Sequence, residues 1–321
     1  MKRFILIVLV VLAATGCRKS VEPDYRAEMR AFVRQISIKA KQARPGFIII
    51  PQNGHQLISS DGSPGGTAVT DYLNAIDGLG REDLFYGYDA DDAATPGPES
   101  DEMKAMMDMA LGQGKTILVT DYCFTQSKMD DSYSRNNQSG FISFAADHRE
   151  LDHIPAYPAQ VFQANNDSVS ALSGAKNFLY LINPENFSSR NGFIQAVAAS
   201  AYDLVIMDLF FNDGTAFTAS EIAQLRNKPG GGTRKIICYM SIGEAENYRY
   251  YWKDYWNSRP PSFILSENPS WTGNYKVKYW DEKWQGIIFK DNHSYLNRIL
   301  DAGFDGVYLD IVDGFEFFEE I

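Results

Sequence analysis

The chain has 321 residues, of which 45% are hydrophobic and 22% are charged. This composition supports a large buried core and excludes a chain that is disordered throughout. The formal net charge of −11 opposes binding to nucleic acid and would attract a cationic substrate; solubility is the alternative interpretation of this charge.

The first 17 residues predict a signal peptide of the lipoprotein type. Lys2 and Arg3 precede the apolar run 4–14, and small residues then lead to Cys17. The run is too short for a good transmembrane helix. We expect lipid attachment to Cys17 and export to a bacterial membrane, at the outer membrane or the cell surface. A plain secretory signal with an incidental cysteine is the alternative, and export follows from both.

Residues 18–24 form a short tether, and residues 25–321 are expected to form one domain of alternating strands and helices. The strands are runs of Ile, Val and Leu without polar alternation, which is typical of parallel strands buried on both faces. The expected strands are 47–50, 84–88, 116–120, 141–145, 178–182, 204–207, 235–240 and 306–309. The expected helices are 25–43, 67–79, 99–112, 190–200, 220–226 and 285–302.

About eight strand–helix units predict an α/β protein with the TIM (β/α)8 barrel fold. A doubly wound sheet is the alternative, but no G-x-G-x-x-G follows any expected strand. Cys123 and Cys238 are not closely spaced and are interpreted as small buried residues. The four histidines include no HExxH or similar pattern, so no metal site is expected, and no motif calls for a cofactor.

Polar side chains stand where several expected strands end. Asp121, Asp208 and Asp310 each follow an apolar run, and Gln52 and Asn53 follow the first strand. In a barrel these residues would meet at one end of the strands, where binding and catalysis take place. One such Asp could equally be a helix N-cap, but several carboxylates at the same end favour a site.

Aromatic residues accompany these carboxylates. The insertion 247–284 holds most of the tryptophans and many tyrosines. Exposed Tyr and Trp rings can stack on the C–H faces of sugars, and paired carboxyl groups hydrolyse glycosidic bonds. The sequence therefore indicates glycoside chemistry and a polysaccharide or oligosaccharide partner.

Five segments resemble the glycoside hydrolases related to endo-α-1,4-polygalactosaminidases, glycoside hydrolase family 114. They are Cys238–Trp252, Glu267–Trp284, Gly303–Phe318, Pro51–Leu57 and Glu82–Tyr86. The resemblance implies a TIM barrel and an extracellular glycan-degrading role. In relatives of this type, PQNG and EDLFY follow the GVYLD motif, whereas here they precede it. The resemblance thus implies a circularly permuted barrel in which strands 47–50 and 306–309 are neighbours.

The resemblance also implies catalytic residues. Asp310 matches the catalytic Asp and is expected to be the nucleophile or base, while Tyr308 replaces a Glu of the family segment. The second carboxylate of the family lies at a later strand, where this chain has no equivalent Glu in 86–88. Glu244 is the substitute expected to act as general acid, and the residues ranked behind it are Glu246, Asp208 and Glu82.

The expected function is that of a secreted glycoside hydrolase with a carboxylate acid/base mechanism, with galactosamine-containing polymers as candidate substrates. The expected substrate ligands are Asp208, Asp121, Gln52, Asn53, Glu246, Tyr88, Tyr239, Tyr308 and Asp313. A non-catalytic surface lipoprotein that binds glycans is the alternative. A metal-dependent hydrolase would need clustered His and Asp ligands, which the sequence pattern does not indicate.

Overall fold

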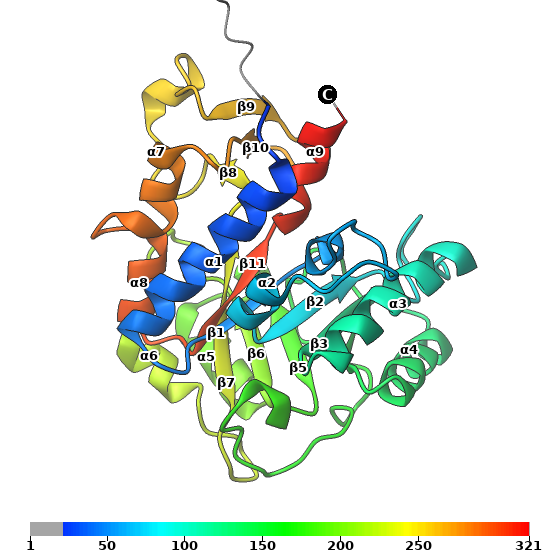
Figure 1. The fold of residues 1–321 in the computed structure, drawn as a ribbon. Coiled ribbons are helices and arrows are strands. Elements are labelled where there is room, and N and C mark those ends of the chain that lie inside the picture. The colour runs from blue at the N-terminus through cyan, green and yellow to red at the C-terminus, as the bar shows by residue number, and fades with distance from the viewer. Residues whose placement is uncertain (1–21, 321) are drawn as a thin grey trace, which may run out of the picture.

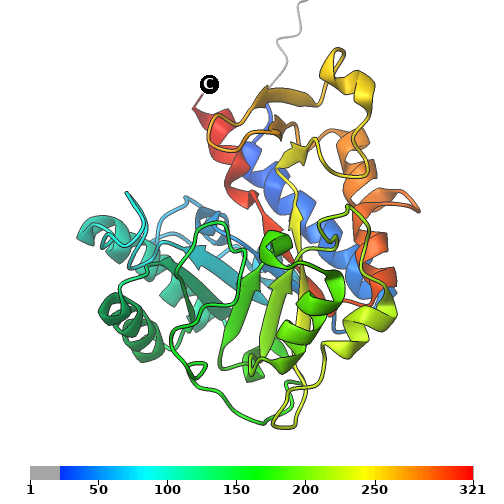
Figure 2. The ribbon, with the colours of Figure 1, turned by 180° about the vertical axis from the view of Figure 1, so that it is seen from behind.

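The computed structural model describes residues 22–320 and shows an α/β protein with two parallel sheets and one antiparallel sheet (Figures 1 and 2). The strands are β1 (Ile48–Pro51), β2 (Gly78–Glu82), β3 (Thr116–Tyr122), β4 (Ile142–Ala146), β5 (Phe178–Leu181), β6 (Leu204–Met207), β7 (Lys235–Ser241), β8 (Glu244–Glu246), β9 (Ile264–Glu267), β10 (Asn274–Val277) and β11 (Gly306–Asp310). The α-helices are α1 (Tyr25–Ala43), α2 (Thr70–Ala75), α3 (Gly97–Gly112), α4 (Gln126–Gln138), α5 (Arg190–Ala199), α6 (Ala219–Gln224), α7 (Glu282–Gln285), α8 (Tyr295–Ala302) and α9 (Phe315–Glu319). Within this part of the chain, no helix has the length and apolar character needed to cross a membrane.

The parallel strands form two sheets. The larger has the order β1-β11-β7-β6-β5 and the smaller has the order β2-β3-β4. An isolated parallel bridge between Gln52 and Gly80 connects β1 to β2, and the Asn53 N–H donates to the Gly80 carbonyl at 2.9 Å. No strand ladder joins β4 to β5 within residues 22–320. The expected α/β class with parallel strands is therefore confirmed, whereas a closed barrel is not formed by strand pairing.

Strands β1 and β11 are neighbours although they come from opposite ends of the chain. Ile48 pairs with Gly306, and the parallel ladder continues to the end of β1. The helices beside them also meet, because Arg26 of α1 forms an ion pair with Glu319 of α9 at 2.8 Å. Figure 1 shows the blue first helix next to the red last helix. The first and last elements therefore pack into one unit.

Continuous apolar runs form the strands, as the sequence predicts. Strand β6 reads Leu-Val-Ile-Met and is completely buried, and β11 is buried over Gly306–Leu309. Strands of this kind need apolar cover on both faces. All but one of the expected strands lie within two residues of an observed parallel strand.

The strand expected at 84–88 is wrong. The structure instead has β2 at Gly78–Glu82, followed by a turn in which Asp83 has a positive φ of 57°. The sequence of β2 is GLGRE, which contains no apolar run. Glycine stands at position 80 because the Tyr308 ring leaves no room for a side chain. A Cβ atom at Gly80 would lie 2.0 Å from the Tyr308 hydroxyl oxygen. The correction makes Glu82 the last residue of a strand.

Most expected helices are present, and their bounds differ where the same residues form another element. Helix α1 has the expected bounds, and its N-cap Asp24 accepts a hydrogen bond from the Ala27 N–H at 2.9 Å. The helix expected over 67–79 is shorter because its last residues belong to β2. The helix expected over 285–302 is interrupted after a π-helical turn, and α8 begins only at its own N-cap, Ser294. Helix α4 was not expected, because its sequence is strongly polar and few of its side chains are buried.

The insertion after β7 forms the antiparallel sheet β8-β10-β9. Several of its aromatic rings pack into the core instead of facing solvent. Trp284 is completely buried, and its indole N–H donates to the Ile242 carbonyl at 2.8 Å. Tyr248, Tyr255 and Trp271 are the large aromatic residues of the insertion that remain exposed. The insertion is thus a folded layer with a few rings on its surface.

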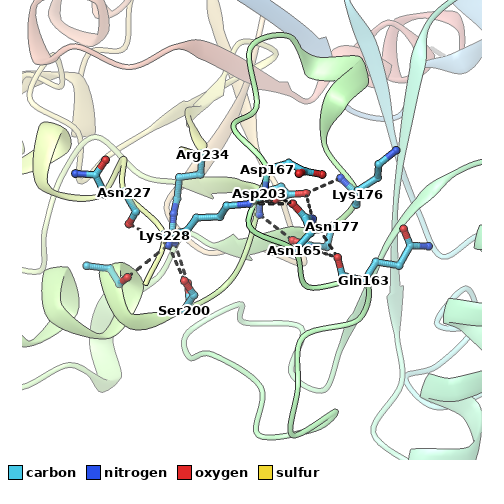
Figure 3. Close-up of polar contacts among 11 residues, drawn as sticks. Gln163, Asn165, Asp167, Lys176, Asn177, Ser200, Asp203, Asn227, Lys228 and Arg234 are labelled. Carbon is cyan, nitrogen blue, oxygen red and sulfur yellow. Dashed lines mark hydrogen bonds and ion pairs between the residues drawn. The ribbon is translucent and has the colours of Figure 1, made fainter. Parts of the chain in front are cut away.

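A buried polar network lies at the amino ends of β6 and β7 (Figure 3). The Lys228 ammonium lies 2.6 Å from Oδ1 of Asp203, and both side chains are 1% exposed. The other Asp203 oxygen accepts hydrogen bonds from the Asn165 amide and the Lys176 N–H, each at 2.8 Å. Both oxygens of the carboxylate are therefore satisfied, as a buried charge requires. The network attaches the long connection before β5 to the amino ends of the strands.

Candidate active site

A cavity of about 710 Å³ opens at the carboxyl ends of the parallel strands. This volume lies within the range of sites that hold small-molecule ligands. The wall combines residues at the ends of β1, β2, β6, β7 and β11 with residues of the insertion. The sequence-predicted residues that line it are Gln52, Asn53, Asp208, Tyr239, Glu244, Glu246, Asp310 and Asp313.

Asp310 ends β11 and faces this cavity. The Tyr239 hydroxyl of the neighbouring strand β7 donates a hydrogen bond to Oδ2 of Asp310 at 2.5 Å. Burial raises the pKa of Asp310 to about 8, with a further contribution from the Glu82 carboxylate, while the Tyr239 hydrogen bond opposes the shift. Asp310 is consequently a group that can hold a proton at neutral pH.

Glu82 ends β2 on the other side of β1 and lines the same cavity. The Tyr122 hydroxyl donates to one of its oxygens in a short hydrogen bond, and the Asn53 amide donates to the other at 3.1 Å. Both contacts supply donors, which is the arrangement that an ionised carboxylate accepts. Glu82 and Asp310 thus flank β1 as two carboxyl groups with different surroundings.

Asp313 is a third carboxyl group in the wall. Burial raises its pKa to about 7, the Glu316 carboxylate adds to the shift, and the Arg81 guanidinium opposes it. Arg81 precedes Glu82 on β2 and therefore places a positive charge beside this acidic group. The cavity wall therefore carries several carboxyl groups, and burial raises the pKa of Asp310 and Asp313 among them.

Glu244 also lines the cavity, but its carboxylate is already engaged. Its Oε1 atom accepts contacts from the Lys276 ammonium and the Asn268 amide, each at 2.9 Å. The residue is 1% exposed and belongs to β8. One oxygen of the Glu244 carboxylate is thus held by a partly buried ion pair and an amide.

Glu246 and Asp208 share one buried guanidinium. The Arg249 Nε lies 2.7 Å from Oε2 of Glu246, and its NH2 atom lies 2.7 Å from Oδ2 of Asp208. Burial raises the pKa of Asp208, while Arg249 opposes the shift. Removing one member of this triad would leave a buried charge without its partner. These residues therefore shape one side of the cavity as an ion-pair network.

Comparison with known protein families separates the chain into two parts. Residues 180–320 match glycoside-hydrolase family GH114. The matched segment carries Asp310, Tyr239 and the Arg249 network, whereas the residues before it carry Glu82 and Asn53. The cavity is built from both parts, because β1 and β2 lie beside β11.

Curated relatives from three prokaryotes share part of this chain. An uncharacterized protein of Methanocaldococcus jannaschii is 41% identical over 160 residues, covering 49% of this chain and 42% of the relative. An uncharacterized protein of Deinococcus radiodurans is 39% identical over 123 residues, covering 38% and 37%. An uncharacterized protein of Thermotoga maritima is 36% identical over 124 residues, covering 39% and 36%. The chain therefore spans about two fifths of the length of the curated relatives it matches.

Three predicted ligands do not line the cavity. One further predicted residue lies outside the part of the chain that the structure describes. Asp121 is completely buried and accepts hydrogen bonds from the Phe85 N–H at 2.8 Å and the Ser132 hydroxyl at 2.6 Å. Tyr308 is completely buried between strands, where its ring fills the space left by Gly80. Tyr88 is exposed but stands away from the cavity wall. The predicted lipidation site, Cys17, falls outside residues 22–320.

Two features of the structure have only a weak signal in the sequence: Glu82 at a strand end in the cavity wall, and a group of histidines. The apolar run after Glu82 predicts a strand over 84–88, so the sequence pattern does not indicate that Glu82 ends a strand. His148, Asp152 and His153 come together in the loop after β4, with ligand atoms within 4.8 Å of one another. Their spacing matches none of the common zinc motifs. Only the short interval between these three residues could have drawn attention to them.

Proposed function

We propose that this protein is a glycoside hydrolase that uses Asp310 and Glu82 as its pair of carboxyl groups. The observation that carries the proposal is the placement of these two groups on either side of β1, at the wall of one cavity. Glycoside hydrolases cleave with one carboxyl group that donates a proton and a second that attacks or activates water. The match of residues 180–320 to a glycoside-hydrolase family supports this reaction class.

The surroundings of the two groups support a different role for each. Asp310 has a raised pKa and can protonate the glycosidic oxygen as the bond breaks. Glu82 accepts hydrogen bonds from Tyr122 and Asn53 and acts as the nucleophile or as the base that activates water. This arrangement reverses the role expected for Asp310 and replaces Glu244, whose oxygen is bound to Lys276.

The substrate in this proposal is a polysaccharide or oligosaccharide, with galactosamine-containing chains as the leading candidates. The wall carries several carboxylates, which suit the amino group of an unacetylated hexosamine. Trp271 and Tyr248 lie at the wall and are exposed, so their rings can stack on sugar faces. Gln52 and Asn53 supply amide groups for sugar hydroxyls.

The proposed fold is a TIM barrel with circularly permuted strand order. The parallel pairing of β1 with β11 and the bridge from β1 to β2 support it, since both are contacts that a permuted barrel requires. Relatives of unpermuted order would continue from β11 directly into strands equivalent to β1 and β2. A closed barrel tolerates such a change because its chain ends lie close together.

We also propose export and attachment of the mature chain to a bacterial membrane through lipidated Cys17. The charged, apolar and small-residue pattern of 1–17 supports this proposal. Labelled fatty acid fed to expressing cells should appear in the wild-type protein and not in Cys17→Ser. Equal labelling of both would refute lipidation at this residue.

Activity is tested with a soluble form that begins after Cys17, by measuring reducing ends released from galactosaminogalactan and a panel of other glycans. Asp310→Asn and Glu82→Gln should each lower turnover by about 100-fold or more, because each removes one acid–base group. Glu102→Gln, which changes an exposed carboxylate of α3, is the control and should keep wild-type turnover. Full turnover in either cavity variant on a cleaved glycan would refute the carboxyl pair.

A binding measurement separates catalysis from simple glycan binding. Both cavity variants should still bind the cleaved glycan in calorimetry, because Asn and Gln keep the shape of the wall. If the wild-type protein binds glycans from the panel but releases no reducing ends, the hydrolase proposal fails and a glycan-binding protein is left.

A further inference from the structure

The loop after β4 gathers two histidines and an aspartate, and the two histidines line a second hollow that shares Arg149 and Glu150 with the main cavity. His148, Asp152 and His153 each direct one ligand atom toward the others, and these atoms lie within 4.8 Å of one another. His148 is exposed, whereas Asp152 and His153 are partly buried. The group is therefore open to solvent on one side and supported by protein on the other.

The contacts of Asp152 with each histidine are close to the spacing of metal ligands. Nδ1 of His148 lies 3.2 Å from Oδ1 of Asp152, and Nδ1 of His153 lies 2.6 Å from the same oxygen. In a tetrahedral zinc site, bonds of about 2.0–2.1 Å place neighbouring ligand atoms about 3.3 Å apart. The first contact already has this spacing, and the second would need to open by less than about 1 Å.

A second layer of contacts orients two of the three residues. Nε2 of His153 lies 3.1 Å from Oδ1 of Asp147, so a proton on Nε2 would leave Nδ1 free to bind a metal. The second oxygen of Asp152 accepts a hydrogen bond from the Asn186 amide at 2.7 Å. Carboxylate and amide partners of this kind fix the ring orientation of metal-binding histidines and the direction of metal-binding carboxylates.

We propose that His148, Asp152 and His153 bind a zinc-class divalent cation, with water as the fourth ligand. Imidazole and carboxylate are the donors that suit Zn²⁺, and three protein ligands with an open position is a common zinc arrangement. The competing arrangement is a protonated His153 held between Asp147 and Asp152, in which a proton takes the place of the metal. Zinc binding requires that this proton be released.

The position of the loop gives such a cation a structural consequence. Arg149 follows His148, lies 2.9 Å from Asp83 and 2.7 Å from Asp91, and places its guanidinium 3.8 Å from the centre of the Tyr122 ring. Tyr122 is the residue that donates to Glu82. A cation bound by this group would restrain the loop, and Arg149 of the same loop packs on Tyr122, which donates to Glu82.

The test measures Zn²⁺ binding directly and does not depend on any glycan. Protein stripped with a chelator and dialysed is titrated with Zn²⁺ by calorimetry and against a chromophoric zinc indicator. One equivalent should bind, and His148→Ala and His153→Ala should each weaken binding at least 10-fold. Asp147→Asn keeps all three ligands and should weaken binding by about 10–100-fold through loss of the second layer.

His293→Ala is the matched control, because His293 is exposed and lies outside the group. It should bind Zn²⁺ as the wild-type protein does. Circular dichroism establishes that each variant is folded, and Co²⁺ in place of Zn²⁺ should give the visible absorption of a tetrahedral site. The proposal is overturned if the wild-type protein binds no stoichiometric Zn²⁺, or if His148→Ala and His153→Ala bind it as tightly as His293→Ala does.

Discussion

Asp310 should lower the stability of the folded protein at neutral pH, and its replacement by Asn should remove this effect. Burial, with the neighbouring Glu82 carboxylate as the next contribution, raises the pKa of Asp310 from 3.8 to about 8. Between these two values the folded state retains a proton that the unfolded state releases. The contribution of Asp310 to stability is therefore most favourable at low pH and falls as the pH rises from about 4 to about 8.

The magnitude follows from this pKa difference. Each pKa unit corresponds to about 1.4 kcal/mol, so the full effect at pH 7 is about 4 kcal/mol. Between pH 5 and pH 7 alone, the effect grows by about 2–3 kcal/mol. Asn has nearly the same shape and still accepts the Tyr239 hydrogen bond, but it does not titrate. The stability of Asp310→Asn relative to the wild-type protein should therefore rise by about 2–3 kcal/mol over this interval.

Urea unfolding followed by tryptophan fluorescence at pH 5, 6 and 7 measures the free energies of unfolding. Glu102→Gln removes the same charge from an exposed position on α3, and its difference from the wild-type protein should stay nearly constant. If Asp310→Asn and the wild-type protein lose stability in parallel as the pH rises, Asp310 does not have a raised pKa. Asp310 would then hold no proton at neutral pH and could not act as the acid.

The remaining predictions concern the reaction, the buried charge pair and the close packing at β2. On a cleaved glycan, kcat/KM should fall on the alkaline side with a midpoint near pH 8 as Asp310 loses its proton, and a flat profile to pH 10 would contradict its role as the acid. Lys228→Met leaves Asp203 buried without its partner and should cost about 3–5 kcal/mol in urea unfolding, whereas the exposed Lys283→Met should change little. Gly80→Ala should lower the free energy of unfolding by about 1–3 kcal/mol, because the new Cβ atom meets the Tyr308 ring. Gly97→Ala is the control, because a Cβ atom there meets no atom within 4 Å, and equal stabilities of the two variants would argue against this close packing.

Local sequence patterns predicted much of the fold. The bounds of α1 and β6 were predicted without error, because an amphipathic repeat and an apolar run report burial directly. The position of Asp310 at a strand end follows from the same rule, since it comes immediately after the buried run 306–309. Strand β2 could not be predicted from local sequence, because Gly80 packs against the Tyr308 ring and Arg81 lies near the Asp313 carboxyl group. Both partners come from distant parts of the chain.

From the sequence alone, carboxyl groups and aromatic rings are expected beside a set of buried parallel strands. The sequence does not indicate which carboxyl group stands opposite Asp310, because Glu82 and Glu244 both occur beside apolar runs. The two differ only in the folded chain, where the Lys276 ammonium pairs with Glu244, whereas Tyr122 and Asn53 donate hydrogen bonds to Glu82. The physical reason is that the state of a buried carboxyl group depends on the charges and donors that surround it in space. Those partners lie tens of residues away along the chain, where no local pattern can indicate them.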